Sequence, residues 1–405
     1  MKVLIVGAGA VGLSTAYWLH QAGHEVSVVE RGGIAAGVSW GNAGEICPAV
    51  ATPLAEPGLV VSALANVFAK GSALSMRPTQ VLRNLPFFLR LLAKSNARDF
   101  RHGTRVLTEL GKDGLELFGH MQSEIGTFQL VKDDYLQVYS SRERSIGSRD
   151  EYLSLFGETI DCGDILSTDE LKAADPSLGT EARAGFFLRD QAYLDPGQFC
   201  NAIADYLRGE GAEIHTHTAV ERLIETPGSV TAVTAAGDLV ADRCVVAAGV
   251  WSAQLLKSIG VRIPMYPGKG YSFNIFPKTP PRHVLKLEEA HVGVVPMDSG
   301  VRVAGTMEFS GYGLSIDQRR IRSIIHAARP FLADVDWEAR KNEWAGLRPL
   351  TPDGMPYVGR VGQGQVWVAA GHQMLGVLLA PSTGKRLADS LSGSEAPVMR
   401  HLAVR

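Results

Sequence analysis

Short apolar runs that lead into glycine recur at the beginning, in the middle and near the end of the chain. Residues 3–6, 243–249 and 366–371 each combine such a run with glycine or other small residues at its end. An apolar run of this length without alternation is typical of a strand buried on both faces, as in a parallel sheet covered by helices. We therefore predict one buried sheet to which the chain returns from three distant segments.

Helical and alternating patterns occupy the stretches between these runs. Residues 53–126 are mostly helical in pattern. Ser167 and Glu170 have the spacing of a capping box, and Asp195-Pro196 is a second typical helix start. Further helices are expected at 13–22, 318–331 and 382–391, and further strands at 25–29, 135–139, 213–217, 220–225, 230–235 and 239–241 and within 265–306.

The turn between the first strand and the first helix has the spacing G-x-G-x-x-G. Gly7 permits a tight turn, Gly9 lets a pyrophosphate approach the backbone, and Gly12 lets helix and strand pack closely. Glu30 ends the second strand, where a carboxylate accepts both ribose hydroxyls and repels a 2′-phosphate. With a strand before it, a helix after it and the acid beyond, the motif predicts a dinucleotide-binding site on the helix N-terminus.

The length of 405 residues is sufficient for two domains. The threefold return to the nucleotide-binding sheet favours a large flavin nucleotide over the cofactor of a simple NAD dehydrogenase. We therefore expect an α/β protein with a Rossmann-like domain that the chain visits discontinuously, through residues 1–52, 190–258 and 343–405. Residues 53–189 and 259–342 are expected to form an α+β substrate domain of sheet and helices.

Composition and charge exclude several other classes of protein. The formal net charge is −2, which gives no general attraction to nucleic acid. The four cysteines are scattered and the histidines lack metal-ligand spacing, so neither a disulfide framework nor a metal site is expected. Met1 stands one residue before the first strand, which leaves no room for a signal peptide. We therefore expect a cytoplasmic protein, either free or peripheral on the cytoplasmic face of the inner membrane.

Several further motifs make the chain resemble a known family. They are Ser39-x-x-Asn42-Ala43-Gly44, residues 246–252, residues 266–272, residues 346–354 and Gly371-His372-x-x-Leu375-Gly376. Together with the glycine motif they resemble the D-amino acid oxidase-like (DAO) superfamily of FAD-dependent oxidoreductases, and within it the bacterial D-amino acid dehydrogenases of the small-subunit type. The resemblance covers nearly the whole chain. It implies the glutathione reductase/DAO type of fold, with the flavin ring at the junction of the two domains.

The resemblance also implies the cofactor and the reaction. The cofactor is expected to be non-covalent FAD, and the reaction is hydride transfer from the Cα–H of a D-amino acid to flavin N5. The imino acid formed is expected to hydrolyse to a 2-oxo acid and ammonia, and the electrons to pass to a quinone or another respiratory acceptor. A partner subunit is left open. The residues expected to bind FAD are Gly7, Gly9, Ala10, Val11, Gly12, Glu30, Arg31, Ser39, Asn42, Ala43, Gly44, Val220, Ala248, Gly249, Gly371, Gln373, Met374 and Leu375.

Arg348 is the strongest candidate for a catalytic-site residue, because the family places a carboxylate clamp in this motif. A planar guanidinium holds a carboxylate through two parallel hydrogen bonds and so orients the Cα–H. Tyr271 is a candidate to cover or hydrogen-bond the substrate, and a core tyrosine with a satisfied hydroxyl group is an equally favoured interpretation. His372 is a candidate beside the flavin, as a group that orders its loop more than as a base. Arg302 lies in a predicted strand; of two interpretations, that it reaches the substrate carboxylate or that it faces solvent, we favour the second.

The chain departs from the family pattern at two places. Trp40 and Gly41 replace small residues in the first loop, and Gln373 and Met374 replace a Gly-Thr pair after His372. Both changes fall where flavin and substrate should meet. They do not alter the expected class of reaction, but they leave the identity of the substrate undetermined. The alternative is a dehydrogenase or oxidase of a cyclic or N-substituted amino acid, such as D-proline, hydroxyproline, sarcosine or glycine.

Residues 57–108 form a basic segment with interleaved apolar residues. Asp99 is its only acid. Such a stretch is typical either of a helix on an anionic membrane surface, where it could meet a quinone, or of a helical cap with solvated charges. We leave both interpretations open. Its cations are Lys70, Arg77, Arg83, Arg90, Lys94, Arg98, Arg101 and Arg105.

Two non-dehydrogenase functions are weaker alternatives. An RNA-modifying flavoprotein would need a basic face, which the net charge does not favour. A non-catalytic flavoprotein that acts as a binding subunit would not need the carboxylate clamp at Arg348. Covalent attachment of the flavin through Cys47 is likewise disfavoured, because buried free cysteines are common.

Overall fold

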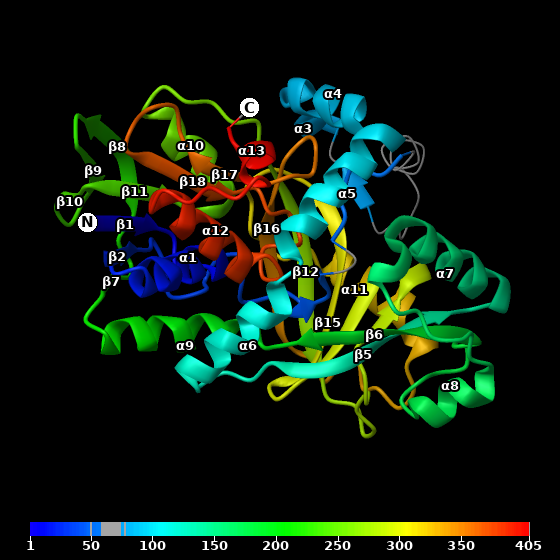
Figure 1. Ribbon diagram of the computed structural model, residues 1–405. Helices are drawn as coiled ribbons and strands as arrows, with labels where there is room; N and C mark the ends of the chain where they lie inside the picture. The colour runs from blue at the N-terminus through cyan, green and yellow to red at the C-terminus, as the bar shows by residue number, and fades with distance from the viewer. Residues whose placement is uncertain (49–50, 58–73, 77, 405) are drawn as a thin grey trace.

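A computed structural model describes residues 1–48, 51–57, 74–76 and 78–404 and shows two large sheets side by side, with a third, three-stranded sheet packed on the smaller of the two (Figure 1). The smaller sheet has the neighbours β17-β18-β11-β1-β2-β7. All of its strand pairs are parallel except β17 with β18. Its strands are β1 (Lys2–Val6), β2 (Glu25–Val29), β7 (Glu213–His215), β11 (Arg243–Val246), β17 (Tyr357–Arg360) and β18 (Val366–Ala370). The three predicted returns of the chain are therefore confirmed.

Helices cover one face of this sheet, and a small antiparallel sheet covers the other. The helices are α1 (Ala10–Gln21), α9 (Pro196–Gly209) and α12 (Ala380–Leu391). Gly384 of α12 lies against the backbone of α1, because a Cβ built at Gly384 would stand 2.7 Å from the carbonyl carbon of Ser14. The opposite layer contains β8 (Val220–Thr226), β9 (Ser229–Thr234), β10 (Leu239–Ala241) and α10 (Ser252–Lys257).

The larger sheet has the neighbours β16-β12-β15-β14-β13-β5-β6-β3, with β4 paired to β15. Neighbours are mostly antiparallel, so successive side chains of a strand alternate between its two faces. The strands are β3 (Glu45–Ile46), β4 (Leu74–Met76), β5 (Val131–Tyr139), β6 (Ala184–Tyr193), β12 (Tyr266–Ile275), β13 (Leu285–Leu287), β14 (Val292–Met297), β15 (Gly300–Phe309) and β16 (Lys341–Leu350).

We call the side of the larger sheet that carries Arg348 the front face and the other side the back face. On the back face, α11 (Gln318–Ala328) and α8 (Thr168–Ala174) pack with Tyr271 and Phe273. On the front face, α4 (Leu85–Lys94) packs on β12, β15 and β16, and α7 (Arg142–Phe156) packs on β5 and β6. The remaining helices are α3 (Pro78–Arg83), α5 (Ala97–Gly111), α6 (Gly114–Ile125) and α13 (Met399–Leu402).

Some predicted details are confirmed and others differ. The capping box at Ser167 and Glu170 forms at the start of α8, and Asp195 caps α9. The first helix begins at Ala10, three residues earlier than predicted. The predicted domain boundaries stay a prediction, but β16 belongs to the larger sheet although residues 343–350 were assigned to the nucleotide domain. Among the described residues, no helix combines the length and the apolar character needed to cross a bilayer.

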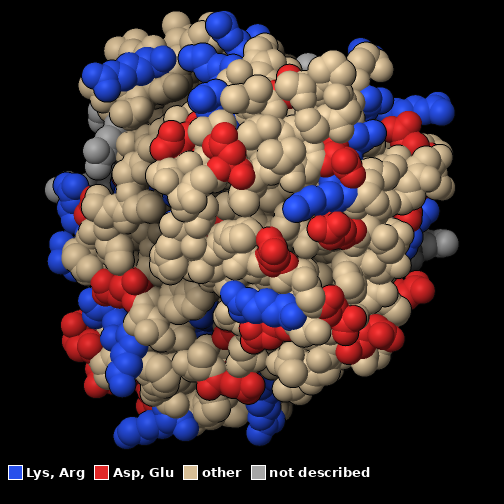
Figure 2. Space-filling model, turned by 90° about the vertical axis from the view of Figure 1, so that its left-hand side faces the viewer, with Lys and Arg blue, Asp and Glu red and all other residues tan. Residues whose placement is uncertain are grey.

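The surface over the nucleotide-binding half carries mixed charges. Figure 2 shows this side of the molecule, where Lys and Arg side chains are interspersed with Asp and Glu. That face therefore presents no continuous basic surface of the kind that binds a nucleic-acid backbone.

Candidate active site

The glycine turn after β1 has the geometry that a pyrophosphate needs. Gly7 has φ +117°, and a Cβ built there would collide with the carbonyl of Ala247. A Cβ at Gly12 would collide with the Gly7 carbonyl, so α1 packs directly on the turn. Gly9 is the extended N-cap of α1 and provides no side-chain cap, which leaves helix N–H groups available to an anion.

The acid at the end of β2 is held beside this turn. The Glu30 carboxylate accepts hydrogen bonds from the backbone N–H groups of Ala8, at 3.0 Å, and Gly32, at 2.8 Å. Backbone donors on both oxygens fix a negative charge where the ribose is expected. The neighbouring Arg31 places its guanidinium 3.5 Å from the centre of the Trp251 ring.

The remaining residues predicted for the adenosine half gather around Gly7 and Glu30. Ala248 follows β11 and packs on the Gly7 turn, with its Cα 3.2 Å from a Cβ built at Gly7. Thr218, two residues before Val220, donates its backbone N–H to the Glu30 carbonyl at 2.8 Å. Gly249 takes φ +56° where the chain turns away. Phosphate donors, a ribose acceptor and a close backbone therefore lie together, and they fit the ADP half of FAD.

The loop from Ser39 to Gly44 connects the glycine turn to the larger sheet. Ser39 accepts a hydrogen bond from the Ala10 N–H through its Oγ, at 3.0 Å. Asn42 accepts from the Gly44 N–H at 2.8 Å and donates through Nδ2 to the Met374 carbonyl at 3.3 Å. The two segments predicted to flank the flavin ring are therefore in direct contact.

Side chains of the larger sheet hold the carbonyls of this loop. Arg302 donates through Nη1 to the carbonyls of Trp40, at 2.8 Å, and Asn42, at 3.1 Å. Ser272 donates to the Gly41 carbonyl at 2.8 Å. Arg302 is only 2% exposed, so our expectation that it faces solvent is wrong. The alternating strand pattern places it on the front face, beneath a loop that the sequence did not predict there.

The segment from Gly371 to Leu375 lies next to Arg348. Gln373, with φ +53°, donates its N–H to the carbonyl of Pro349 at 3.2 Å, and its Oε1 accepts from the Leu54 N–H at 3.2 Å. Its buried Nε2 has no partner among the described residues. An orphaned amide donor at this position fits the carbonyl and ring-nitrogen acceptors of a flavin. Met374 is 41% exposed and Leu375 partly buried.

His372 is buried and held away from acid–base chemistry. Its Nε2 lies 3.0 Å from the hydroxyl of Thr383 in α12. Burial lowers the pKa of His372 to about 3, so the imidazole is uncharged at neutral pH. This arrangement suits a residue that orders the loop, and a role as a general base is not supported.

Arg348 places a cation without a carboxylate partner on the front face. Its Nη1 donates to the Thr306 carbonyl at 2.8 Å, and the guanidinium covers Gly270, where a Cβ would collide with it. Burial lowers the pKa of Arg348 to about 10, so the side chain remains charged at neutral pH. Within the described part of the chain no acid pairs with it. A half-buried guanidinium without a charged partner binds a carboxylate strongly.

Tyr271 does not join Arg348. It lies on the back face, 1% exposed, and donates to Glu308 Oε2 at 2.5 Å. Burial and Glu308 raise the pKa of Tyr271. Tyr271 neighbours Gly270 on β12, so its side chain points to the opposite side from the guanidinium over Gly270. The interpretation that Tyr271 covers the substrate therefore requires correction, because the sequence did not fix which face each residue takes.

Trp344 is a front-face residue that the sequence analysis missed. Its indole lies against Gly41 of the loop and against Gly346, since a Cβ at either glycine would collide with the ring. Trp344 and Arg348 are both half-buried and point to the same side of β16. The glycine at position 41, which departs from the family pattern, is therefore the space that the indole fills. Only the pairing of distant segments could have indicated this contact.

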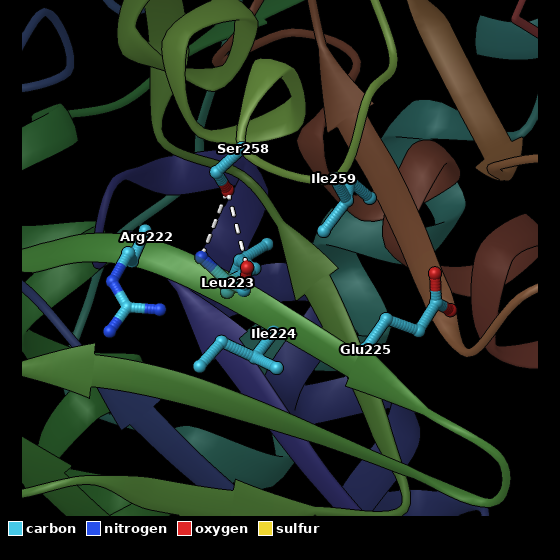
Figure 3. Close-up of a pocket in the computed structure, with 6 residues that line it drawn as sticks. All are labelled: Arg222, Leu223, Ile224, Glu225, Ser258 and Ile259. Atoms are coloured by element: carbon cyan, nitrogen blue, oxygen red, sulfur yellow. Dashed lines mark hydrogen bonds between the residues drawn. The ribbon is translucent and has the colours of Figure 1, made fainter.

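A separate surface hollow of about 430 Å³ is unrelated to this site. Figure 3 shows it beside β8 and α10, lined by Arg222, Leu223, Ile224, Glu225, Ser258 and Ile259. Ser258 is occupied by hydrogen bonds with the backbone of Leu223, and the lining includes none of the predicted FAD or substrate residues. We assign no function to it.

Comparison with known proteins supports the same family. A family model described as DAO, FAD dependent oxidoreductase, matches residues 2–390. A D-amino acid dehydrogenase of Rhizorhabdus wittichii is 30% identical over 98% of this chain and 98% of its own length. One from Cereibacter sphaeroides is 31% identical over 97% of this chain and 92% of its own length.

Solved structures share the fold. Glycine oxidase from Bacillus cereus aligns with TM-score 0.76 and 20% identity, over 100% of this chain and 98% of that one. L-proline dehydrogenase from P. horikoshii aligns with TM-score 0.74 and 18% identity, over 100% of this chain and 96% of that one. The predicted fold class and the FAD cofactor are thereby confirmed. The chain belongs to the DAO family of FAD-dependent oxidoreductases.

Proposed function

We propose that the protein is an FAD-dependent dehydrogenase of D-amino acids. The observation that carries this proposal is Arg348, a half-buried guanidinium without a described acidic partner, next to the segment of Gln373 that is predicted to hold the flavin ring. The relatives from Rhizorhabdus wittichii and Cereibacter sphaeroides are D-amino acid dehydrogenases, which agrees with it. The product is an imino acid that hydrolyses to a 2-oxo acid and ammonia.

Orientation is the main contribution of the protein to this reaction. Arg348 holds the substrate carboxylate, and the Thr306 carbonyl fixes the plane of the guanidinium. Bound FAD supplies the chemistry by accepting the hydride of the substrate Cα–H. No acid–base pair is required if the amine enters in its neutral form, which agrees with the neutral, buried His372.

A second candidate function is oxidation of a cyclic or N-substituted amino acid. The observation that favours it is the segment Gln373-Met374, which departs from the family pattern beside Arg348. The fold is shared with a glycine oxidase and an L-proline dehydrogenase, although the identities of 20% and 18% concern the fold alone.

Anaerobic reduction of the bound flavin tests both candidates. The purified holoenzyme is mixed with D- and L-amino acids, D-proline, hydroxyproline, sarcosine and glycine, and the loss of flavin absorbance is followed. We expect primary D-amino acids to bleach the flavin and L-forms to leave it oxidised. Bleaching by D-proline or sarcosine alone supports the second candidate, and no bleaching by any of them contradicts both.

We further propose that an exposed leucine stripe contacts an anionic membrane. Leu85, Leu89 and Leu92 of α4 are 44%, 55% and 42% exposed, while Phe87 and Phe88 of the same helix are buried. The spacing i, i+4, i+7 places the three leucines on one face. The helix lies at the top of Figure 1, and its exposed cations Arg90 and Lys94 point away from the leucine stripe, so they attract anionic lipid only across the width of the helix. Lys70 and Arg77 of the predicted basic segment lie outside the described residues.

Binding to vesicles tests this surface. We expect co-sedimentation with phosphatidylglycerol vesicles, weaker binding to phosphatidylcholine, and loss of binding when Leu85, Leu89 and Leu92 are all replaced by Ser. Leu314→Ser is the control, because Leu314 is 49% exposed outside this helix. Equal binding of the triple variant and the native protein contradicts the proposal. Reduction of a soluble quinone, measured in parallel, tests the proposed electron acceptor.

A further inference from the structure

One row of residues crosses six neighbouring strands on the front face. Each member is directly paired with the next in the sheet, so all six side-chain positions point to the same side. In order from β16 to β5 they are Trp344, Ser272, Ala304, Gly293, Lys286 and Gln137. Trp344, the first member of the row, lies two residues before Gly346 and four before Arg348 on β16. The row therefore belongs to the part of the front face that lies beneath the candidate site, which we call the floor.

The loop predicted to flank the flavin lies across this row. Gly41 contacts its Trp344 end, and Glu45, just after the loop, lies over Gly293. Lys286 Nζ donates to Glu45 Oε2 at 2.7 Å. Their side chains are 28% and 20% exposed, although β13, which carries Lys286, lies in the interior of the sheet. The ion pair is therefore accessible from the front face.

The floor between Arg348 and this pair is made of small residues. Gly270 and Ala304 lie on β12 and β15, and Ala304 is only partly buried. The guanidinium of Arg348 rests between these two strands, and Lys286 is two strands further on. With strands spaced by about 4.8 Å and residues along a strand by about 3.4 Å, the Glu45 carboxylate over β14 stands roughly 10 Å from the guanidinium and the backbone of Lys286 roughly 14 Å. An amino acid with an unbranched side chain of about four or five atoms spans that distance, with a hydrogen bond at each end.

The far end of the floor has unused hydrogen-bond acceptors. Gln137 is 1% exposed and stands beside Lys286, yet its Oε1 has no partner among the described residues. Glu288 follows β13, and burial, opposed by Lys286, raises its pKa. Burial opposes the charge of Lys286, but Glu45 and Glu288 outweigh it and raise the pKa of Lys286. Glu45 and the amide oxygen of Gln137 thus lie beside Lys286, and Glu288 follows Lys286 by two residues at the end of β13 and is half-buried.

We propose that Glu45, Gln137 and Glu288 form a subsite for the positively charged end of a substrate side chain. The inference rests on the proposed function, and it narrows the substrate class to amino acids whose side chain ends in an ammonium or guanidinium group. Arg348 binds the carboxylate at one end of the floor, and the acceptors bind the cation at the other. Lys286 holds Glu45 in place and is a positioning residue.

Ligand binding without turnover is the first test. 6-Aminohexanoate and hexanoate share a carboxylate and a chain, lack an α-amine, and differ in the terminal ammonium. Each is titrated into the holoenzyme while the flavin absorbance spectrum is recorded. We expect 6-aminohexanoate to bind roughly tenfold or more tightly, as a hydrogen-bonded charge should. Equal binding of the two overturns the proposal, and so does tighter binding of adipate, which would place a carboxylate on Lys286.

Substrate kinetics with matched variants are the second test. We expect the ratio of kcat/KM for D-lysine to that for D-norleucine to fall by roughly tenfold in Gln137→Leu and further in Glu45→Gln. Gln191→Leu is the control, because Gln191 is also a buried glutamine with an unpartnered Oε1 but lies on β6, outside the row. If the ratio is unchanged in Gln137→Leu and Glu45→Gln, the subsite is wrong.

The two proposals fail in different ways. Flavin reduction by D-norleucine or D-alanine without preference for D-lysine leaves the dehydrogenase function intact and rejects the subsite. Absence of flavin reduction by any amino acid rejects the dehydrogenase function. In that case the analogue titration still tests the subsite, because it depends on binding alone.

Discussion

At the residue scale, the guanidinium of Arg348 has N–H donors that remain available to a substrate. Its described polar contacts are those of Nη1 with the Thr306 carbonyl and the Met307 sulfur. We predict that Arg348→Lys lowers kcat/KM for amino acids by about a hundredfold, since a point charge replaces the planar fork and truncation of a buried charge pair costs about 2–5 kcal/mol. Anaerobic flavin reduction as a function of substrate concentration measures this. Arg360→Lys on the exposed edge strand β17 is the control. An unchanged kcat/KM in Arg348→Lys would remove the proposed carboxylate clamp.

Arg302 is a second single residue whose replacement should have a measurable effect, in this case on FAD binding. Replacement by Met leaves the carbonyls of Trp40 and Asn42 without their donor, and each buried unsatisfied group costs about 1–3 kcal/mol. We predict weaker FAD binding, measured as an increased dissociation constant by fluorescence of released FAD. Ser272→Ala removes a single bond to the same loop and should have a smaller effect. If Arg302→Met binds FAD as tightly as the native protein, this loop does not support the cofactor.

Local spacing predicted the residues of the nucleotide turn better than those of the sheet. Gly7, Gly12 and Glu30 are determined by a strand, a turn and a helix that are adjacent in sequence. The positions of Tyr271 and Arg302 depend on which face of a strand each takes. In β12, a register irregularity between Lys269 and Tyr271 in the pairing with β15 makes that choice invisible in the sequence.

Close packing of helices gives a prediction at the element scale. Gly384→Ala inserts a methyl group 2.7 Å from the Ser14 carbonyl carbon, between α12 and α1. We predict a loss of about 1–3 kcal/mol in the free energy of unfolding, since overpacking strains a dense core. Gly147→Ala in α7 is the matched control, because no atom lies within 4 Å of its built Cβ. That control should gain about 0.5–1 kcal/mol from helix propensity. Chemical denaturation measures both, and equal stability of the two variants would contradict the packing argument.

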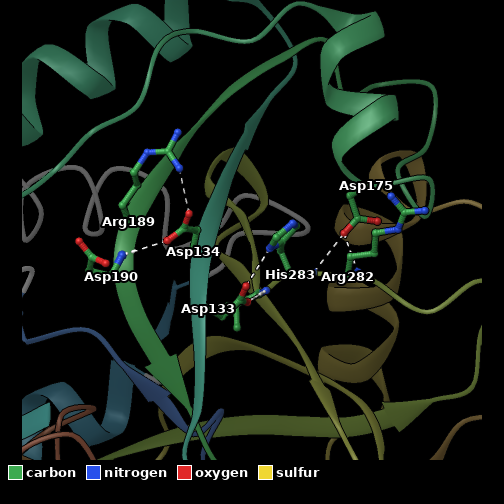
Figure 4. A network of polar contacts seen from close by, with 8 residues as sticks. Asp133, Asp134, Asp175, Arg189, Asp190, Arg282 and His283 are labelled. Carbon is green, nitrogen blue, oxygen red and sulfur yellow. Dashed lines mark hydrogen bonds and ion pairs between the residues drawn. The ribbon is translucent and has the colours of Figure 1, made fainter.

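The junction of β5 and β13 should make stability depend on pH. Figure 4 shows His283 directed at Asp133, with Nδ1 2.7 Å from Oδ1. The hydrogen bond to Asp133 outweighs burial and raises the pKa of His283 above 6.5 in the folded state. The folded state therefore binds the proton more tightly, and the stabilisation is complete below pH 6.5 and lost as the pH rises through the raised pKa.

Comparison of variants across pH measures this effect. The difference in the free energy of unfolding between native protein and His283→Gln should be largest near pH 6 and shrink toward pH 9. His215→Gln, in an exposed pair on β7, is the control and should change stability little. If the difference in the free energy of unfolding grows as the pH rises, the protonated form of His283 does not stabilise the folded state.

Whole-molecule stability should depend on the cofactor, because distant segments meet at its site. Above the dissociation constant, each tenfold rise in free FAD should add about 1.4 kcal/mol to the free energy of unfolding. Riboflavin lacks the ADP half that the Gly7 turn and Glu30 are placed to bind, so it should stabilise far less. Thermal unfolding at several ligand concentrations measures both. A melting temperature that does not respond to FAD would contradict the assigned site.

The sequence predicted the topology of the smaller sheet better than that of the larger one. Buried strands that end in glycine indicated the returns at β11 and β18 directly. The pairing of β16 with β12 joins residues about 75 positions apart, and no local pattern encodes it. The row from Trp344 to Gln137 was unpredictable for the same reason, since it depends on five successive strand pairings.

The position of β1 in the smaller sheet also affects the synthesis of the protein. β1 lies between β2 and β11, and β18 then pairs with β11, so the sheet cannot close until residue 370 has left the ribosome. The second edge of β1 is covered only by β11, which ends at Val246, so at about 5–20 residues per second β1 waits roughly 12–50 s with one edge unpaired. An apolar strand with an open edge is prone to aggregate during that interval. Efficient production of this chain should therefore require a chaperone that shields the nascent N-terminal half until its last strands arrive.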